Sequence, residues 1–412
     1  MALRTDGALI PNIFRAYVYP IDEKRRVYET TATPPSIRTP ARIAPLMGQS
    51  GKIAIIGTVG VPARYGGFET LAEELVRAAA KAGKAHRLTV WCSAPQTAQP
   101  HPATYLGAAL RYLPLRANGA QSIPYDALSL LQAARSGHQA ALLLGVSGAL
   151  ALPALRAAFP MRIVTNIDGL EWQRAKWGGV ARRVLQRSEV AAARWSHHLV
   201  ADNPEIARHI RDRYGRDPVE IPYGFEDTAP QPPIAIADLA LPPRYALAMA
   251  RAEPENNLAL ILALFASDPS LPPLVVLSNW ADTRHGQALA ARYRAHPKLH
   301  LCAAEYDPAK LAAIRAGAMC YIHGHAAGGT NPALVTMMGA RLPIAAWDCS
   351  YNRATTEGQA TFFNSAEGLR ACLYAFDETA FGAAMADKLH AIAARRYRWA
   401  DVTDAYFRLL GL

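Results

Sequence analysis

The sequence predicts an α/β protein with two doubly wound domains, each a parallel sheet covered by helices. Three observations support this fold class. Short apolar runs alternate with helical patterns along most of the chain. A segment with five prolines, 226–243, interrupts the alternation, and 412 residues exceed what one ordinary core holds. Ligands of such folds bind at the carboxyl ends of the strands, so we expect a cleft between the two domains.

The first domain begins with KIAIIGTVGVPARYGGFETLAEEL, residues 52–75. The apolar run 52–56 suits a strand buried on both faces. A loop with Gly57, Gly60, Gly66 and Gly67 leads into a helix that has acidic residues early and lysines late. Strand, glycine loop and helix N-terminus together favour a site for an anion or a polyhydroxylated ligand. The spacing is not G-x-G-x-x-G, which argues against a nicotinamide-dependent oxidoreductase.

The other predicted elements follow in order. In the first domain we expect strands at 88–92, 110–115, 141–145, 162–166, 199–201 and 219–221, and helices at 179–195 and 204–213. In the second we expect strands at 245–250, 274–278, 299–303, 319–323 and 343–347, and helices at 255–266, 285–295, 308–316 and 331–339. Two further helices are expected between 379 and 410, around Tyr397-Arg398-Trp399.

These elements divide the chain into five parts. We expect a disordered extension over 1–50, a first domain over 51–228, a linker over 229–243, a second domain over 244–395 and a last helix over 396–412. Met47 is an alternative start to Met1.

Composition limits the classes of function. The net charge of +11 favours anionic partners such as nucleotide phosphates, lipid headgroups or nucleic acid, although a solvated basic surface explains it equally well. No nucleic-acid-binding motif is recognised, and neither the five cysteines nor the twelve histidines have metal-ligand spacing. The most apolar run, 139–155, is shorter than the roughly 20 residues of a membrane span. We therefore expect a cytoplasmic protein, soluble or peripheral at the membrane, with no metal or other cofactor.

Several segments resemble a known family when taken together. They are 57–75, NIDGLEWQRAKWG (166–178), VADNPEIARHI (200–210), IPYGFE (221–226), ARAEPENN (250–257), HGHAAGGTNPALVTMMGA (323–340) and the terminal YRWADVTDAYFRLL. In this order they resemble GT-B glycosyltransferases of family 4, particularly the rhamnosyltransferase-like branch of bacterial polysaccharide assembly. The resemblance runs from residue 52 to the C-terminus, with the last helix crossing back to the first domain.

The resemblance implies two Rossmann-like domains and a retaining, metal-free sugar transfer. The donor would be a nucleotide-diphosphate-sugar, carrying rhamnose or another hexose. The acceptor would be a saccharide, lipid-linked at the inner face of the cytoplasmic membrane. In the mechanism usually proposed for such enzymes, a donor phosphate oxygen receives the acceptor proton.

By resemblance, the donor is held by the second domain. Arg251 would bind the diphosphate, because a guanidinium offers a fixed fork of donors; an ion pair with Glu253 or Glu255 is the alternative. Backbone N–H groups of Gly329, Thr330 and Asn331 would hold the donor phosphates, with Asn331 as N-cap and Pro332 opening the helix. An ordinary capped helix is the alternative. Asn257 and Thr336 complete the predicted donor-binding residues.

The first domain would hold the acceptor and the reacting sugar. By resemblance, Asp168 would hydrogen-bond a sugar hydroxyl and take part in catalysis. Trp172, or alternatively Trp177, would stack on a sugar face unless it belongs to the core. Arg64, Gly66, Gly67 and Glu69 would face the acceptor. Arg174, Lys176, Arg182, Arg183 and Arg187 would face a membrane or a lipid-linked diphosphate, or form a plain solvated surface.

The chain also departs from the family pattern. Ala326, Thr336 and Ala354 stand where relatives often have glutamate, one of which holds the nucleotide ribose. Loss of that carboxylate would cost about 1.5–3 kcal/mol. Glu357 is a possible substitute through a shifted loop. The departures keep open a second function, a weak or inactive GT-B protein that binds a nucleotide or a partner.

Overall fold

The first domain is a doubly wound sheet. The computed structural model describes residues 51–412 except 65, 170–171, 173–177, 226–240 and 378. Eight strands, ordered β3-β4-β2-β1-β5-β6-β7-β8, pair in parallel apart from the β3–β4 edge. They are β1 (Ile53–Ile56), β2 (Leu88–Ser93), β3 (Thr104–Tyr105), β4 (Ala108–Leu113), β5 (Ala140–Leu144), β6 (Arg162–Ile167), β7 (His198–Ala201) and β8 (Val219–Glu220).

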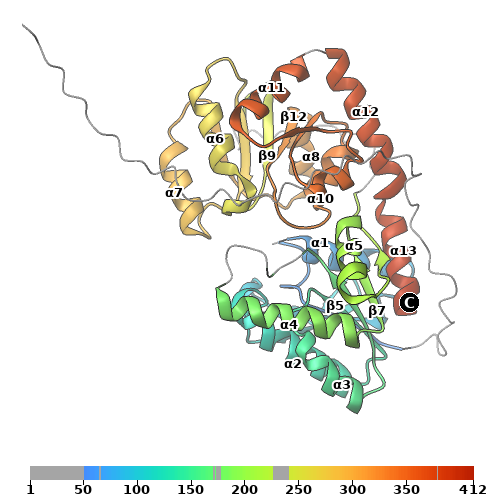
Figure 1. Ribbon diagram of the computed structural model, residues 1–412. Helices are drawn as coiled ribbons and strands as arrows, with labels where there is room; N and C mark the ends of the chain where they lie inside the picture. The colour runs from blue at the N-terminus through green and yellow to red at the C-terminus, as the bar shows by residue number, and fades with distance from the viewer. Residues whose placement is uncertain (1–50, 65, 170–171, 173–177, 226–240, 378) are drawn as a thin grey trace, which may run out of the picture. The chain divides into compact units, whose positions relative to one another are not determined.

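Helices cover both faces of this sheet. The helices are α1 (Gly67–Lys81), α2 (Ser122–Arg135), α3 (Leu152–Ala158), α4 (Gly179–Trp195), α5 (Pro204–Tyr214) and the C-terminal α13 (Trp399–Leu410). Along β1, Ala54 and Ile56 pack into the core under α2 to α5, whereas Ile53 and Ile55 pack under α1 and α13. The continuous apolar run of β1 is thus explained by burial on two faces (Figure 1). The last helix of the chain completes the core of the first domain.

The second domain repeats the plan with six parallel strands in the order β11-β10-β9-β12-β13-β14. They are β9 (Tyr245–Met249), β10 (Leu274–Ser278), β11 (Leu299–Ala303), β12 (Ala318–His323), β13 (Ile344–Trp347) and β14 (Thr361–Phe363). The helices are α6 (Leu258–Ser267), α7 (Arg284–Tyr293), α8 (Pro308–Ala316), α9 (Pro332–Gly339), α10 (Ser350–Thr355), α11 (Ala366–Asp377) and α12 (Thr379–Arg396). Helices α6, α7 and α11 share one core, and α8, α9 and α12 share the other.

Each sheet has a point where the strand order reverses. In the first, β1 lies between β2 and β5, and in the second, β9 lies between β10 and β12. The loops that follow these central strands diverge to opposite faces, which opens a crevice at the carboxyl ends. Both sheets belong to one compact unit. The predicted fold of two doubly wound domains is confirmed.

Some expectations differ or lie outside the described residues. The short strands β3 and β14 were not predicted, because two or three residues carry too little pattern. The extension 1–50 and most of the predicted linker lie outside the described residues and stay predictions. Among the described residues, no helix combines the length and apolarity that crossing a membrane requires.

Candidate functional site

A cavity of about 830 Å³ lies at the carboxyl ends of both sheets. The loops that follow β1, β4, β5 and β6 form one wall, and the loops that follow β9 and β12, with α8 and α9, form the other. Its volume lies within the usual range for small-molecule sites. It is bordered by most of the predicted site residues: Arg64, Gly66, Gly67, Glu69, Asp168, Arg251, Gly329, Thr330, Asn331 and Thr336.

The glycine loop after β1 is held from within its own domain. The buried Glu69 carboxylate oxygen Oε1 accepts from the Val59 amide at 2.7 Å and from the Thr58 hydroxyl at 3.0 Å. Burial raises the pKa of Glu69 despite these bonds. Gly57 has φ +94°, and a Cβ there would lie 2.1 Å from the Leu144 carbonyl oxygen. Close packing against β5 therefore explains why residue 57 is glycine. Gly57 also borders the cavity, together with Gly66 and Gly67.

Asp168 and Asp202 form a pair of carboxyl groups at the ends of β6 and β7. The Tyr223 hydroxyl donates to Asp168 Oδ2 at 3.3 Å. Burial, with the neighbouring Asp168 as the second cause, raises the pKa of Asp202 well above its usual range. Burial therefore favours the protonated form of Asp202. Asp202 was given no role from the sequence, although an acid directly after an apolar strand points to this edge of the sheet.

Asp202 also bonds the turn that was expected to hold donor phosphates. Its Oδ2 accepts from the Thr330 amide at 2.9 Å, and the Thr330 hydroxyl donates to the Asp202 carbonyl at 2.5 Å. A phosphate contact from the Thr330 amide therefore stays a prediction that requires this bond to open. Asn331 is the N-cap of α9, as predicted, and accepts from the Ala333 amide at 2.9 Å. Gly329 and Asn331 remain on the cavity wall.

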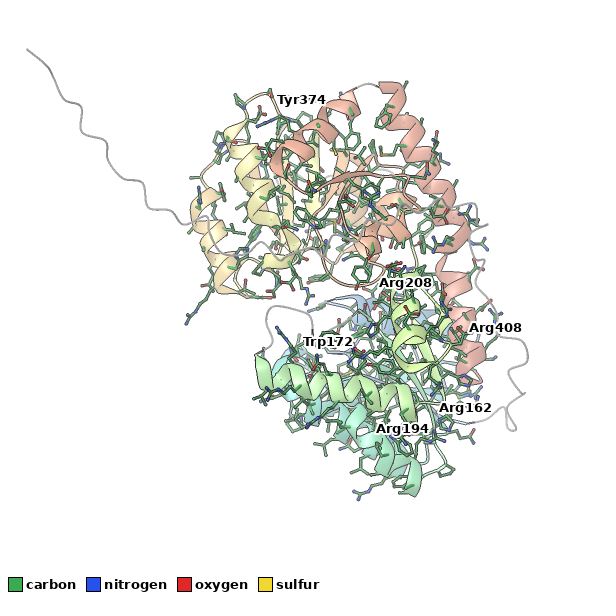
Figure 2. All side chains as sticks on the ribbon, in the orientation of Figure 1. Arg162, Trp172, Arg194, Arg208, Tyr374 and Arg408 are labelled. Carbon is green, nitrogen blue, oxygen red and sulfur yellow. The ribbon has the colours of Figure 1, made fainter. Side chains whose placement is uncertain are left out.

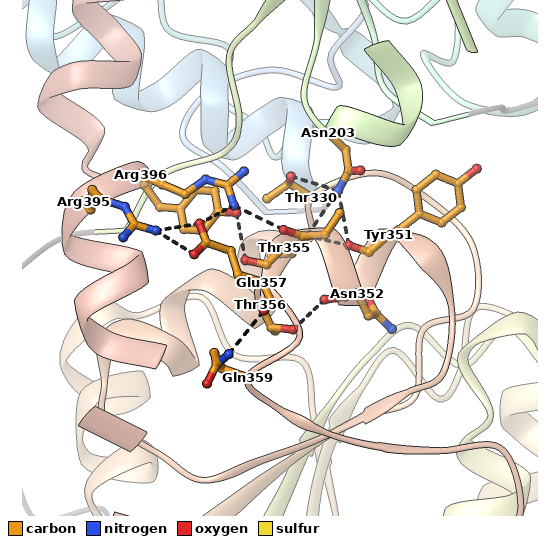
Figure 3. Close-up of polar contacts among 12 residues, drawn as sticks. Asn203, Thr330, Tyr351, Asn352, Thr355, Thr356, Glu357, Gln359, Arg395 and Arg396 are labelled. Atoms are coloured by element: carbon orange, nitrogen blue, oxygen red, sulfur yellow. Dashed lines mark hydrogen bonds and ion pairs between the residues drawn. The ribbon is translucent and has the colours of Figure 1, made fainter. Parts of the chain in front are cut away.

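Asn203 adds to the contacts between the domains. Its Oδ1 caps α5 by accepting from the Glu205 amide at 3.0 Å. Its Nδ2 donates to Thr355 Oγ1 at 3.2 Å and to the Tyr351 carbonyl at 3.3 Å (Figure 3). One buried side chain therefore starts a helix in the first domain and bonds α10 in the second.

Arg251 is the second residue after the end of β9, at the point where the strand order of the second sheet reverses. It borders the cavity, and its carbonyl accepts from Asn256 Nδ2 at 2.8 Å, which shapes the loop. Asn257 does not border the cavity. Its Nδ2 donates to the Gly324 carbonyl at 2.8 Å, joining the loops after β9 and β12. This bond gives Asn257 a structural role, and its donor contact stays a prediction.

Trp172 also lies away from the cavity. Its Nε1 donates to Glu189 Oε2 at 2.7 Å, and the Arg213 guanidinium carbon lies 5.9 Å from its ring centroid. Trp172 is labelled in Figure 2, next to α4. The ring packs against the first core, so the alternative of a core residue fits better than sugar stacking. In the predicted basic face, Arg174 and Lys176 lie outside the described residues, and Arg182, Arg183 and Arg187 are exposed on α4.

The second wall contains three residues to which the sequence assigned no role. His323 is fully buried, its Nδ1 lies 3.2 Å from the Tyr321 hydroxyl, and its ring stacks on His325 at 4.3 Å. Burial lowers the pKa of His323, which keeps the ring neutral. Arg315 in the last turn of α8 borders the cavity, and burial lowers its pKa. No ion pair of Arg315 is found within the described part of the chain.

Glu357, the possible substitute for the missing glutamate, is paired with two arginines. Its two carboxylate oxygens lie 2.6 and 2.7 Å from Arg395 Nη2, and Oε1 lies 3.0 Å from Arg396 Nη1 (Figure 3). It does not border the cavity, so the shifted-loop hypothesis stays a prediction that requires these ion pairs to open. Thr336 borders the cavity without a carboxylate. In the described ranges, no group of three or more side chains of the metal-ligating types is placed to hold a metal ion.

Comparisons with known proteins agree with this fold. A family described as "Domain of unknown function (DUF1972)" matches residues 50–226. No curated protein matches the sequence. Among solved structures, sucrose-phosphate synthase from Thermosynechococcus elongatus aligns with a TM-score of 0.72 at 16% identity, over 87% of this chain and 98% of that chain.

Two further solved structures carry nucleotides. HepE from Anabaena, in complex with UDP, aligns with a TM-score of 0.61 at 14% identity, over 87% of this chain and 99% of that chain. The catalytic domain of starch synthase IV from Arabidopsis thaliana, bound to ADP and acarbose, aligns at 0.63 and 14% identity, over 88% and 99%. At such identities the likeness shows the fold, and that fold is the GT-B architecture.

Proposed function

We propose that the chain is a glycosyltransferase that moves a sugar, rhamnose or another hexose, from a nucleotide-diphosphate donor to a saccharide acceptor. One observation carries the proposal. A single cavity reaches the reversal points of both sheets, with Arg251 and the 328–331 turn on one wall and Asp168 on the other. Solved proteins of the same fold bind UDP, UDP-glucose or ADP, which supports a nucleotide-sugar as the donor.

The proposed reaction needs positioning and charge stabilisation. The bond between the acceptor oxygen and the anomeric carbon forms while the bond from that carbon to the phosphate oxygen breaks. The acceptor proton passes to a donor phosphate oxygen, and the anomeric configuration is retained. Arg251 stabilises the negative charge that develops on the leaving diphosphate, and Asp168 orients a sugar hydroxyl. No metal ion and no protein base are required for these steps.

The proposed setting is the assembly of a bacterial surface polysaccharide on a lipid-linked acceptor. The net charge of +11 and the exposed arginines of α4 support contact with an anionic membrane face. Binding to vesicles containing an anionic lipid, compared with neutral vesicles at two salt concentrations, tests this part alone. Equal binding to both kinds of vesicle would remove the anionic lipid from the proposal, and no binding to either would remove the membrane.

A donor panel tests the enzymatic activity. Purified full-length protein is incubated with UDP-, GDP-, ADP- and dTDP-sugars, with and without a lipid-linked saccharide. Release of the nucleoside diphosphate is then measured. We expect one donor to be consumed faster when the acceptor is present. If no nucleotide-sugar bound or turned over, the proposed function would be wrong.

Thr336 favours a second candidate function, a protein that binds a nucleotide without efficient turnover. Thr336 stands on the cavity where relatives often have glutamate, and Glu357 is bound to Arg395 and Arg396. If Thr336→Glu raised turnover sharply from near zero while Thr336→Gln did not, the wild-type chain would be the weak or inactive form. Turnover by the wild-type protein that exceeds that of Thr336→Glu would exclude this candidate.

A further inference from the structure

A polar corner of the cavity has no role in the site described so far. It consists of Asn118 after β4, Ser122 and Asp126 on α2, and Ser147 after β5. All four residues border the cavity and belong to the first domain. We call them the Asp126 corner. It lies beside the reversal point of the first sheet, where doubly wound folds bind ligands.

Asp126 is the deepest residue of this corner. Its side chain is 2% exposed, and its Oδ1 is buried with no hydrogen-bond partner among the residues that the structure describes. A backbone hydrogen bond from Gly148 reaches the carboxyl group. Buried polar atoms are nearly always paired, because an unpaired one costs the free energy of its lost hydration. A ligand group that pairs with this carboxyl would remove that cost.

The surroundings of Asp126 are neutral and rich in hydrogen-bonding groups. Asn118 Nδ2 is also buried without a partner among the described residues. The Ser122 hydroxyl donates to Ser147 Oγ at 3.1 Å, and Ser122 is 6% exposed. Burial raises the pKa of the Asp126 carboxyl well above its usual range, which favours the protonated form, and that form can donate as well as accept.

The chemistry of these groups selects the kind of ligand. An amide, a carboxyl and two hydroxyl groups provide donors and acceptors but no positive charge. A phosphate would need cationic partners, which this set lacks. Vicinal hydroxyls of a sugar both donate and accept, and they match such a set.

We propose that the Asp126 corner binds the hydroxyl groups of an uncharged sugar residue of the acceptor. The inference rests on the proposed function in so far as it names an acceptor. It deepens that function by assigning a sugar, and not the lipid or its diphosphate, to this part of the first domain. It also gives the acceptor a site apart from Arg64, Gly66, Gly67 and Glu69.

Variants of the corner separate acceptor binding from donor binding. Asp126→Leu keeps the shape and removes the hydrogen bonds, and Ser122→Ala is a milder change. Ser129→Ala is the matched control, because Ser129 is a buried polar residue of the same helix that bonds the Tyr125 carbonyl at 2.8 Å and does not border the cavity. Melting temperatures establish that each variant folds.

We expect Asp126→Leu to raise the KM for the acceptor at least tenfold and Ser122→Ala to raise it severalfold. The Kd for the nucleoside diphosphate should change less than twofold in both variants, and Ser129→Ala should change neither value. An unchanged acceptor KM in folded Ser122→Ala and Asp126→Leu would overturn the proposal. So would an equal loss of nucleoside diphosphate binding, which would assign the corner to the donor.

A direct binding experiment does not depend on transferase activity. The methyl glycosides of rhamnose, glucose, galactose and N-acetylglucosamine are titrated into full-length protein and followed by ligand-observed NMR, with glucose 1-phosphate as the charged probe. We expect at least one glycoside to bind wild type and to lose its signal in Ser122→Ala. Preference for glucose 1-phosphate, or signals unaffected by the variant, would contradict the proposal. Sugar binding without nucleotide binding would instead leave the corner intact and refute the proposed transfer.

Discussion

The two walls of the cavity use different chemistry on the same type of fold. On the first wall, Glu69 and Asp126 are buried acids, and burial raises the pKa of each. On the second wall, His323 is a buried base, and burial lowers its pKa. On both walls, desolvation therefore disfavours the charged form of these groups. Arg251 adds a guanidinium to the second wall, which fits a diphosphate, whereas the neutral corner of the first wall fits a sugar.

Loss of Arg251 should give the largest effect. Arg251→Ala removes the guanidinium predicted to stabilise the leaving diphosphate, and removal of one such donor lowers rates by about 10²–10³-fold. We expect a fall of this size in kcat/KM for sugar transfer. Arg251→Lys should recover only part of it, because an ammonium group lacks the planar fork. Steady-state kinetics with the donor identified by the panel measure both.

The control for Arg251 is Arg294→Ala, because Arg294 is an exposed arginine of the same domain away from the cavity. It should retain wild-type activity. Equal losses in the two variants would mean that general charge, and not the position of Arg251, governs the reaction.

Arg315 should contribute to donor binding, and the sequence did not indicate it. Arg315→Met keeps the aliphatic packing and removes a partly buried guanidinium. A charged hydrogen bond contributes about 1.5–3 kcal/mol, so the Kd for the nucleoside diphosphate should rise at least tenfold. The melting temperature of the free protein should rise or stay unchanged, because an uncompensated buried charge is removed. Calorimetry and thermal unfolding test both, and an unchanged Kd would remove Arg315 from the donor site.

Asp202→Asn should change the pH dependence of stability. The unfolded carboxyl has a pKa of about 3.9, and the folded one is raised. The folded state therefore holds the proton that the unfolded state loses, and wild-type stability falls as pH rises above about 4 towards the folded pKa. Asparagine does not titrate. We expect the melting temperature of the variant, relative to wild type, to rise by at least about 2 °C between pH 4 and pH 8.

The exposed Asp212 on α5 supplies the control, because Asp212→Asn should show no such trend. A melting-temperature difference that stays constant with pH would show that Asp202 is ionised in the folded protein. In that case a different carboxyl, such as the adjacent Asp168, holds the proton.

The local sequence predicted the bounds of helices and strands well, but it did not predict which distant residues form side-chain contacts. The bounds of α4 and α8 follow from helical periodicity and flanking glycine or proline, and those of β10 from a β-branched run. Each of these signals lies within the element itself. By contrast, Asp202 bonds Thr330, which lies 128 residues away, and nothing near Asp202 in the sequence indicates that contact.

The same dependence on distant partners explains why two predicted site residues do not border the cavity. Trp172 and Asn257 have side chains that suit a ligand, but Glu189 and the Gly324 carbonyl already bond them. The residue type determines which hydrogen bonds a side chain can make, but it does not show which partners the side chain has in the folded protein. Most of the site residues that the resemblance predicted border the cavity, because the motifs follow the strands whose ends form it. Asp126 and Arg315 lie on helices outside those motifs, and only the structure places them there.

Glu357→Gln should have the smallest effect, and it tests whether the second wall has a hidden carboxylate. The variant weakens the ion pairs with Arg395 and Arg396, which are partly exposed, so stability should fall by about 0.5–1 kcal/mol. The Kd for the nucleoside diphosphate should stay within twofold of wild type, since Glu357 does not border the cavity. Asp387→Asn, which weakens the exposed pair with Arg341, is the matched control and should leave the Kd unchanged. A tenfold loss of nucleotide affinity in Glu357→Gln alone would mean that the 355–358 segment rearranges to bind the donor. The second wall would then contribute a carboxylate to donor binding, which the free protein keeps paired with arginine.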